Sequence, residues 1–281
     1  MKSFVITSDC DHLLAKEHLG ILKTFAENDI FITTAVFARV DEENSWLGRH
    51  CNPSETHGWE NAELRKGLLE AQSMGHEIAF HGTSQCSNTR EEFIKGIEKY
   101  KTIFGDYPFT YIEHGPNPLT HKGFQEGDCK LEMLSNKGAD MDSPYFVKDI
   151  IEKVFSACWT QEFLLSADEI PKEKTGWIVS KDNINYINRM RMLDFVRFQK
   201  LSKKLNNENE SFIGYTHFGY EGYFGPKRRV ILDMFRPFLP ARFEYWHGKH
   251  LEKNITEIRS FLKDHDFQSK TLKEFVLSCQ K

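Results

Sequence analysis

The sequence lacks a hydrophobic run long enough to cross a bilayer. Its longest apolar stretch covers residues 30–37 and is interrupted by Thr33 and Thr34, far short of the roughly 20 apolar residues that a membrane-spanning helix needs. The amino-terminal segment meets a charge at Asp9 and is too short and too polar for a secretory signal. We therefore expect a soluble protein that is not an integral membrane protein.

Cysteine pairs of the C-x-x-C type are also absent. The six cysteines are scattered along the chain without the spacing of a zinc finger, which argues against a structural zinc site and against a disulfide framework. Cysteines that are expected to form neither disulfides nor a zinc site are typical of proteins in a reducing compartment. The predicted location is therefore the cytoplasm.

The chain has no excess of basic charge. Its 281 residues include 37 Lys and Arg against 41 Asp and Glu, which gives a net charge of −4 with neutral histidines. Proteins that bind the phosphate backbone usually carry a basic excess, so nucleic acid is not expected as a partner. Hydrophobic residues at 40% and charged residues at 28% are typical of a globular protein.

The first half of the chain alternates strand and helix patterns. Runs rich in β-branched and aromatic residues indicate strands at residues 4–7, 30–37, 76–81 and 109–113. Apolar residues at helical spacing indicate helices at residues 15–27, 61–74 and 89–104. Gly75 and Gly105 follow two of these helices, and Thr89 with Glu92 forms a capping-box pattern. The alternation predicts a parallel sheet wrapped by helices, open or closed into a barrel.

The second half is less regular. Its patterns predict a strand at residues 211–216 and helices at residues 130–136, 145–155, 183–205, 251–264 and 271–277. The long helix at 183–205 is expected to expose a basic face to solvent. No internal repeat or low-complexity linker divides the chain. We predict one domain over residues 1–281, in which residues 116–210 form a divergent or inserted region.

Side chains suited to chemistry occur at three predicted strand ends, which face a common mouth in parallel α/β folds. The first strand ends with Asp9 and Asp11, the third ends with His81, and the strand at 211–216 is followed by His217. Taken singly, an Asp-x-Asp pair is more often a turn, and a histidine at a strand end is more often a packed residue. Their order along the chain is what points to a site.

Two carboxylates at i and i+2 repel each other unless a cation or donors lie between them. Asp and His together suit Zn²⁺ and similar divalent ions, and a bound water then becomes a usable nucleophile with a second carboxylate as base. Asp9 and Asp11 could divide these two tasks. Cys10, between them, is expected to be a neutral buried thiol or a soft metal ligand rather than a nucleophile.

The motifs resemble those of the NodB-homology polysaccharide deacetylases, carbohydrate esterase family 4. Residues 7–11 (TSDCD) resemble the TFDDG-like motif in a looser D-x-D form, and residues 31–37 (FITTAVF) resemble the ATFFV strand. Residues 75–81 (GHEIAFH) resemble GHEIGNH, the most specific segment. Residues 214–217 (GYTH) resemble the LxH strand, and residues 271–272 resemble the terminal TL element. The resemblance is continuous over roughly the first 115 residues and patchy afterwards.

This resemblance implies an α/β fold, a single-domain distorted (β/α)7-type barrel with an elaborated second half, and amide hydrolysis at its mouth. It implies that Asp9 is the base that deprotonates the attacking water and that His217 is the acid that protonates the leaving amine. The implied metal ligands are Asp11 and His81, with Gln85 at the position of a further histidine. The implied ion is a divalent metal, most simply Zn²⁺, with Co²⁺ or Ni²⁺ as alternatives, and no organic cofactor is implied.

The sequence departs from the family pattern at two positions. An amide oxygen, which Gln85 would offer, is a weaker and harder ligand for zinc than an imidazole. The arginine-containing third motif, RxPxG, has no arginine, since residues 108–117 read PFTYIEHGPN. His114 either takes the place of that arginine near Asp9 or completes the metal set. His114 and Tyr215 are the candidate substrate-binding residues.

Three functions stay open at this point. The first is a hydrolase that removes an acetyl or formyl group from a carbohydrate, the second a metal-independent amidase on the same fold, and the third a catalytically degenerate carbohydrate-binding relative. A basic and aromatic stretch at residues 226–247 could hold a phosphate or pyrophosphate, or form a solvated turn. The expected partner is an N-acylated sugar or glycan intermediate in surface-glycan metabolism, free or linked to a nucleotide or lipid. The oligomeric state is not indicated.

Overall fold

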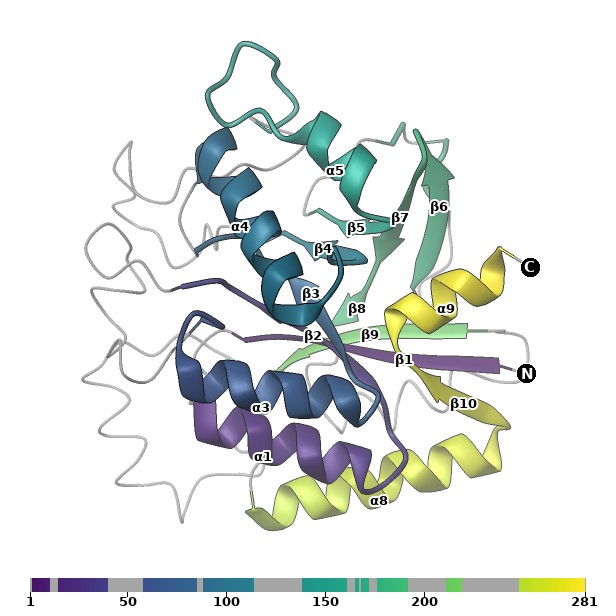
Figure 1. Ribbon diagram of the computed structural model, residues 1–281. Helices are drawn as coiled ribbons and strands as arrows, with labels where there is room; N and C mark the ends of the chain where they lie inside the picture. Colours follow the sequence, from purple (N-terminus) through teal and green to yellow (C-terminus); the bar gives the residue numbers. More distant parts are fainter. Residues whose placement is uncertain are drawn as a thin grey trace, which may run out of the picture.

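The fold is described from a computed structural model of the chain (Figure 1). The structure describes residues 2–10, 15–39, 58–84, 88–113, 138–160, 165–166, 168–171, 176–191, 211–218 and 248–280. The strands are β1 (Lys2–Asp9), β2 (Ile32–Val36), β3 (Glu77–Phe80), β4 (Thr110–Ile112), β5 (Ala157–Trp159), β6 (Trp177–Lys181), β7 (Ile184–Asn188), β8 (Met190–Arg191), β9 (Ser211–His217) and β10 (Phe267–Lys270). The helices are α1 (Ala15–Ala26), α3 (Ala62–Ser73), α4 (Arg90–Phe104), α5 (Lys148–Val154), α8 (Gly248–Asp264) and α9 (Leu272–Cys279).

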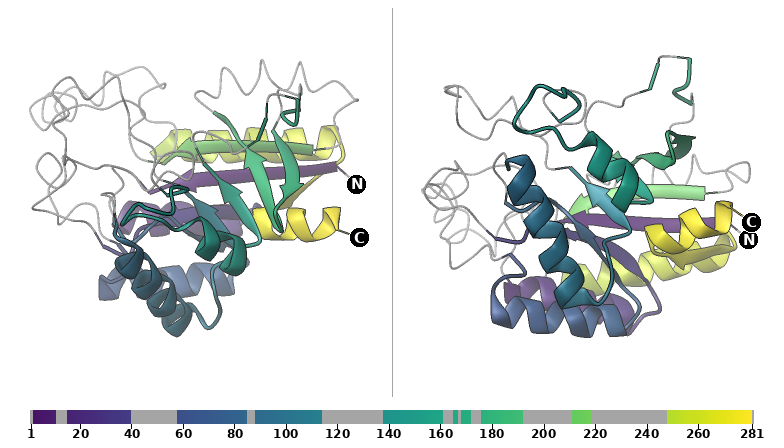
Figure 2. Two further views of the ribbon diagram at one scale, coloured as in Figure 1. Left: turned by 90° about the horizontal axis from the view of Figure 1, so that it is seen from above. Right: turned by 45° about the horizontal axis from the view of Figure 1, so that its top comes forward.

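The strands form one sheet that is curved into a nearly closed barrel. Its order is β6-β7-β5-β4-β3-β2-β1-β9-β8, and β10 pairs with the first half of β1. All neighbours in this path are parallel except the β6–β7 hairpin. The carboxyl ends of the parallel strands therefore open at one end of the barrel. The two ends of the chain lie together at the opposite side in every view (Figures 1 and 2).

Strands β7 and β8 close the barrel. β7 pairs with β5 through Asn185 and Tyr186, and β8 pairs with β9 through Met190 and Arg191. A single residue, Arg189, separates the two strands. The segment thus passes from a position beside β5 to a position beside β9, and the ring β1, β2, β3, β4, β5, β7–β8 and β9 has the seven positions that the resemblance implied.

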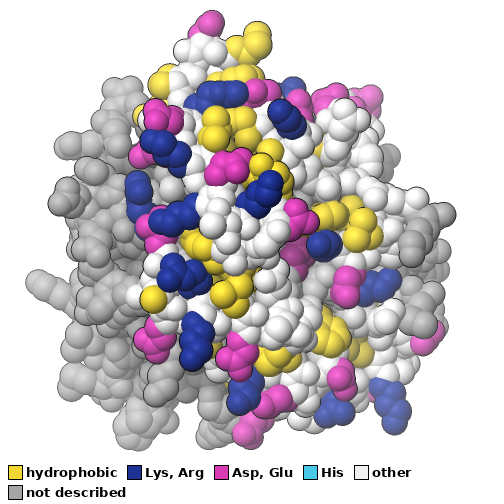
Figure 3. All heavy atoms as spheres, viewed as in Figure 1, with side chains coloured by type: hydrophobic (Ala, Val, Ile, Leu, Met, Phe, Trp, Pro, Cys, Tyr) yellow, Lys and Arg dark blue, Asp and Glu magenta, His cyan; other side chains and the backbone are white. Residues whose placement is uncertain are grey.

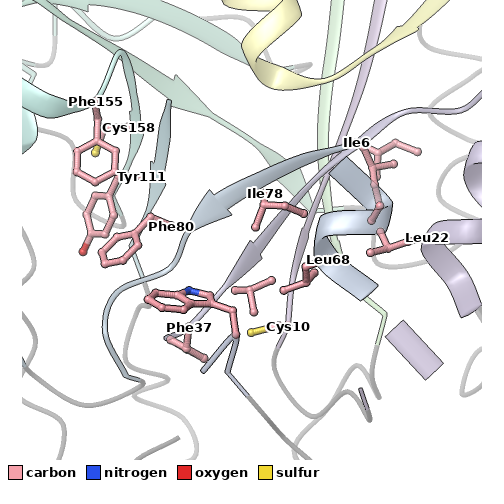
Figure 4. Close-up of a cluster of buried hydrophobic side chains, with 14 of the residues drawn as sticks. Ile6, Cys10, Leu22, Phe37, Leu68, Ile78, Phe80, Tyr111, Phe155 and Cys158 are labelled. Atoms are coloured by element: carbon pink, nitrogen blue, oxygen red, sulfur yellow. The ribbon is translucent and has the colours of Figure 1, made fainter. Parts of the chain in front are cut away.

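Helices cover the outside of the barrel and bury the larger part of the core. Phe80, Tyr111 and Phe155 pack in this layer, and Cys158 lies beside them (Figure 4). Fully buried side chains of this size dominate the stabilisation, at about 25 cal/mol per Å² of apolar area removed from water. The thiol of Cys10 also lies in this apolar layer (Figure 4), which agrees with the expectation of a buried thiol.

Helix α9 closes the amino-terminal end of the barrel. Its apolar side chains, Leu272, Phe275 and Val276, pack against Val5 and Ile213 inside the barrel. The first backbone N–H groups of the helix have no partner within the helix. The hydroxyl of Thr33 accepts the N–H of Leu272 at 2.7 Å, and Glu77 Oε2 accepts the next N–H at 2.8 Å. The TL element therefore has a structural role here.

The elements of the first half confirm the predicted alternation. Helices α1, α3 and α4 and strands β1 to β4 lie where the patterns placed them, and α4 carries the capping box at Thr89. In the second half α5, β9, α8 and α9 are confirmed as well. The predicted helix at 130–136 falls outside the described residues.

The predicted helix at 183–205 is wrong over residues 184–191, which form β7 and β8. Asp182 and Asn183 have φ of +53° and +63°, the left-handed conformation that a two-residue hairpin turn requires and that Asp and Asn tolerate. This turn directs the chain back along β6, and the residues after it pair as strand. Residues 192–205 lie outside the described part.

The outer surface carries charges of both signs. On the described part of the face in Figure 3, Lys and Arg side chains alternate with Asp and Glu over the helices. Several form pairs one helical turn apart, such as Lys95 with Glu91 at 2.6 Å. Exposed pairs of this kind each contribute at most about 1 kcal/mol. Among the described helices, none combines the length and apolar character that crossing a membrane would require.

Candidate functional site

The mouth of the barrel brings two of the predicted catalytic residues onto neighbouring strands. Asp9 is the last residue of β1 and His217 the last residue of β9, and the two are partners in the parallel register. They lie side by side in the backbone although they are separated by most of the chain. Phe218, directly after His217, is fully buried, and its ring lies 5.6 Å from that of Phe25 in α1. This packing anchors the end of β9 to the helical layer.

Asp9 forms a buried ion pair with Arg189. Nη1 of the arginine lies 2.7 Å from Oδ1 of the carboxylate, and Nη2 lies 3.2 Å from Oδ2. The arginine side chain is 0% exposed and that of Asp9 is 8% exposed. Two parallel N–H···O bonds fix the plane of the carboxylate as well as its charge. The arrangement holds an ionised, oriented carboxylate at the end of β1.

Two aromatic rings flank this arginine. The guanidinium carbon lies 4.2 Å from the ring centroid of Trp159, at the end of β5, and 4.6 Å from that of Tyr215, on β9. Both rings are partly buried. A guanidinium over an aromatic face is attracted by the ring quadrupole, more strongly when water is excluded. The ring centroids of Trp159 and Tyr215 lie 6.5 Å apart, so both rings pack on adjacent sides of the guanidinium at the mouth of the barrel.

His81 follows β3 at the same end of the barrel and is buried. Its Nδ1 lies 2.6 Å from the backbone carbonyl oxygen of Ile112 on β4, and its ring lies 4.5 Å from that of Phe37. A carbonyl oxygen can only accept, so Nδ1 carries the hydrogen. In the neutral ring Nε2 is then the acceptor nitrogen. Metal-binding histidines commonly donate their other ring N–H in this manner.

The other two titratable residues of segment 75–81, His76 and Glu77, lie at the opposite end of the barrel. His76 accepts the N–H of Ile32 at Nδ1 and contacts the carbonyl of Leu22 through Nε2, and burial lowers its pKa. Glu77 accepts hydroxyl hydrogens from Thr33 and Thr110 and the N–H of Lys273. Burial raises the pKa of Glu77, and these hydrogen bonds partly oppose the shift. Both residues stabilise the fold far from the mouth.

Three predicted site residues, Asp11, Gln85 and His114, lie outside the described residues. Their roles stay predictions. Of the described residues, no three His, Cys, Asp or Glu form a group that could hold a metal ion. The described residue that fits a ligand role is His81, through its Nδ1 bond to Ile112 and its position at the mouth. Tyr215, predicted to bind substrate, contacts Arg189 there.

Arg189 is the site residue that the sequence reasoning missed. The absence of an arginine in the third motif led to two alternatives for His114, a place near Asp9 or a place in the metal set, and both stay predictions because His114 lies outside the described residues. The structure places Arg189 beside Asp9. The arginine was assigned to a solvated helix, and so it was not considered for the barrel interior. The signal that could have found it is the Asp182-Asn183 dipeptide, which favours a hairpin turn, followed by the alternation of residues 184–188.

The sequence matches no family model and no curated protein. Similar folds occur among solved structures. The polysaccharide deacetylase Bc1974 from Bacillus cereus is 12% identical with a TM-score of 0.44, and the match covers 96% of this chain and 92% of that one. A structure described as T48 deacetylase with substrate is 11% identical with a TM-score of 0.46 and coverages of 99% and 92%. Peptidoglycan deacetylase PdaC from Bacillus subtilis is 11% identical with a TM-score of 0.42 and coverages of 99% and 93%.

Proposed function

We propose that the chain is a hydrolase that removes an N-acyl group, acetyl or formyl, from a carbohydrate by cleaving a linear amide C–N bond. One observation carries the proposal: an ionised carboxylate, Asp9, is held by a buried arginine at the end of β1 and in register with His217. A base and a potential acid on adjacent strand ends of one barrel mouth suit amide hydrolysis, which needs both.

In the proposed reaction the water oxygen attacks the amide carbonyl carbon and Asp9 accepts the water proton. The tetrahedral intermediate then expels the amine as the C–N bond breaks, and His217 delivers a proton to the nitrogen. Without that proton the amine is a poor leaving group. Arg189 keeps Asp9 ionised and in one orientation, because a positive neighbour favours the charged carboxylate.

Asp11, His81 and Gln85 are the residues that would hold a divalent ion, most simply Zn²⁺, with Co²⁺ or Ni²⁺ as alternatives. Such an ion would supply Lewis-acid polarisation of the amide carbonyl. The carbonyl of Ile112 orients His81 by accepting its Nδ1–H. Nε2 is then the ring nitrogen whose lone pair would bind the ion.

The proposed substrate is an N-acylated sugar or glycan intermediate of surface-glycan metabolism, free or attached to a nucleotide or lipid carrier. Support for a carrier comes from the basic and aromatic residues at 226–247, which lie outside the described part. We place the reaction in the cytoplasm because the cysteines suit a reducing compartment. The described thiols of Cys158 and Cys279 are not part of a disulfide.

Release of acetate or formate from a panel of N-acetylated and N-formylated sugars tests the proposal. We expect Asp9→Asn and His217→Ala each to lower kcat by about 10² to 10⁴, with the metal content unchanged. Asp149→Asn is the matched control, since Asp149 also has a bidentate arginine partner, Arg90, but on the outer surface. Its kcat should equal that of the wild type.

Elemental analysis of the purified protein decides the role of the metal. A divalent ion at about one per chain, lost in Asp11→Ala and His81→Ala, is expected. Hydrolysis by metal-free protein would instead favour the metal-independent amidase. Saturable sugar binding without any acyl release would favour the carbohydrate-binding relative and refute the enzyme.

A further inference from the structure

Thr7 lies inside the barrel next to the Asp9–Arg189 pair. It precedes Asp9 by two residues on β1, so the two side chains point to the same face of the sheet. Thr7 is fully buried. Its Oγ1 donates to the carbonyl of Gly214 on β9 at 3.2 Å and accepts from Nη1 of Arg189 at 3.1 Å. The hydroxyl therefore contacts both the arginine and the strand that ends in His217.

The direction of these bonds is fixed by chemistry. The Gly214 carbonyl only accepts, so the single hydroxyl hydrogen of Thr7 points to it. The oxygen lone pairs of Thr7 then face Arg189, which only donates. Nη1 has two hydrogens, and Thr7 Oγ1 and Asp9 Oδ1 take one each. The result is a directed chain of hydrogen bonds from Asp9 through Arg189 and Thr7 to β9.

The rings beside Arg189 cannot replace this hydroxyl. Trp159 and Tyr215 present ring faces to the guanidinium, which attract its charge but offer no oxygen acceptor for its N–H groups. Rotation within the plane is limited by Asp9 and Thr7. Without the hydroxyl, one Nη1 hydrogen would lose its acceptor. A buried N–H group without a hydrogen-bond acceptor is unfavourable, because it has also lost its bonds to water. Asp9 alone would then hold the guanidinium within its plane, and the guanidinium could rotate more easily about the carboxylate.

We propose that Thr7 is a positioning residue for the reaction: its hydroxyl sets the in-plane orientation of Arg189, which in turn orients Asp9, and ties both to the strand carrying His217. The inference rests on the proposed function, in which Asp9 is the base. Misplacement of a catalytic group by about 1 Å can cost up to about 100-fold in rate, so the hydroxyl should influence kcat without touching substrate.

Three variants of β1 test this role. Thr7→Val keeps the shape and removes the hydroxyl, and we expect kcat to fall about 10- to 100-fold with KM within about twofold of the wild type. Thr7→Ser keeps the hydroxyl and should retain kcat within about threefold. Ser8→Ala is the matched control, because Ser8 is equally buried but donates to Thr34. Equal kcat in Thr7→Val and the wild type would overturn the inference.

A second measurement does not depend on activity. In ¹⁵N NMR, a guanidinium held at both Nη atoms shows slow rotation and separate Nη signals, and Arg189→Lys identifies those of Arg189. We expect exchange between these signals to be faster in Thr7→Val than in the wild type, and unchanged in Thr7→Ser and Ser8→Ala. If Thr7→Val does not fold, Thr7→Cys, with its weakly accepting sulfur, is measured in its place. An unchanged exchange rate in the variant that lacks the hydroxyl would refute the inference.

The two proposals fail in different ways. Full hydrolysis by Asp9→Asn would refute the role of Asp9, and with it the proposed function, whatever the NMR spectra show. Unchanged Arg189 signals and unchanged kcat in Thr7→Val, with Asp9→Asn inactive, would refute only the role of Thr7.

Discussion

Arg189 and Asp9 are 180 residues apart in sequence and form a bidentate ion pair inside the barrel. The same arginine is the single residue between β7 and β8, where the chain passes from a position beside β5 to a position beside β9. Closure of the barrel and orientation of the candidate base thus depend on one position. An arginine suits it because the planar guanidinium meets a carboxylate at two points and also packs against the rings of Trp159 and Tyr215.

Removal of this arginine should be far more costly than removal of a surface arginine. Arg189→Met leaves Asp9 as a buried charge without its partner, and we expect a loss of about 3–5 kcal/mol in the free energy of unfolding. Arg90→Met, which breaks a bidentate pair with a 50% exposed carboxylate, should cost about 1 kcal/mol or less. Urea denaturation measures both, and similar losses would show that the Asp9 pair is not effectively buried.

A double variant separates the loss of the pair from the loss of packing. In Asp9→Leu with Arg189→Met no buried charge remains, so part of the stability lost in the single variant should return. The double variant should nevertheless be inactive. If it is no more stable than Arg189→Met, the cost of the single variant comes from the lost packing against Trp159 and Tyr215 rather than from the uncompensated buried charge of Asp9.

The first half of the fold was predictable because each helix is amphipathic and each strand is bounded by clear turn signals. Capping at Thr89 and the glycines at 75 and 105 mark helix ends that the structure confirms. Strands β5 and β10 were missed because a run of three or four residues is too short to show a periodicity. Segment 184–191 was misassigned because its polar and basic residues suggested a solvated helix, whereas Arg189 points into the barrel.

The candidate site was predictable only as separate residues. The strand ends identified Asp9, His81 and His217 from sequence, and β1 and β9 do place two of them in register. The partner of Asp9 was not predictable, because pairing across the barrel depends on how the sheet closes. No local pattern around residue 189 reports that closure.

The buried His18 should make the protein less stable as the pH falls. Burial, with a smaller contribution from His76, lowers the pKa of His18 to about 3 from its usual 6.5. Between these values the unfolded chain binds a proton that the folded chain does not, so stability falls as the pH falls, by up to about 1.4 kcal/mol per pH unit. His18→Gln removes this titration while keeping a polar group near Thr34.

Urea denaturation at pH 7 and pH 5 tests this expectation. The stability advantage of the wild type over His18→Gln should shrink at pH 5. A constant difference for His18→Gln would mean that folding does not change the pKa of His18, which would contradict the prediction.

Glu77 should have the opposite pH dependence. Burial raises its pKa above the usual 4.5, so the folded chain holds a proton that the unfolded chain has lost, and the contribution of Glu77 to stability decreases as the pH rises through that raised pKa. Glu77→Gln does not titrate and keeps an acceptor for the N–H of Lys273. Its stability relative to the wild type should therefore increase between pH 4 and pH 7. A relative stability that falls over this range would contradict the assignment.

His81 and His76 should be found in opposite tautomers although they belong to one short segment. His76 accepts a backbone N–H at Nδ1 and must carry its hydrogen on Nε2, whereas His81 contacts a carbonyl through Nδ1 and must carry its hydrogen there. ¹⁵N NMR distinguishes the two forms, and His76→Asn and His81→Asn assign the signals. On addition of Zn²⁺ we expect the Nε2 signal of His81 to shift while its Nδ1–H signal and both signals of His76 stay in place, and we expect no shift in Asp11→Ala. An Nε2–H form of His81 before metal is added would exclude this histidine as a ligand in the described orientation, because the nitrogen that faces away from Ile112 would then have no lone pair to offer.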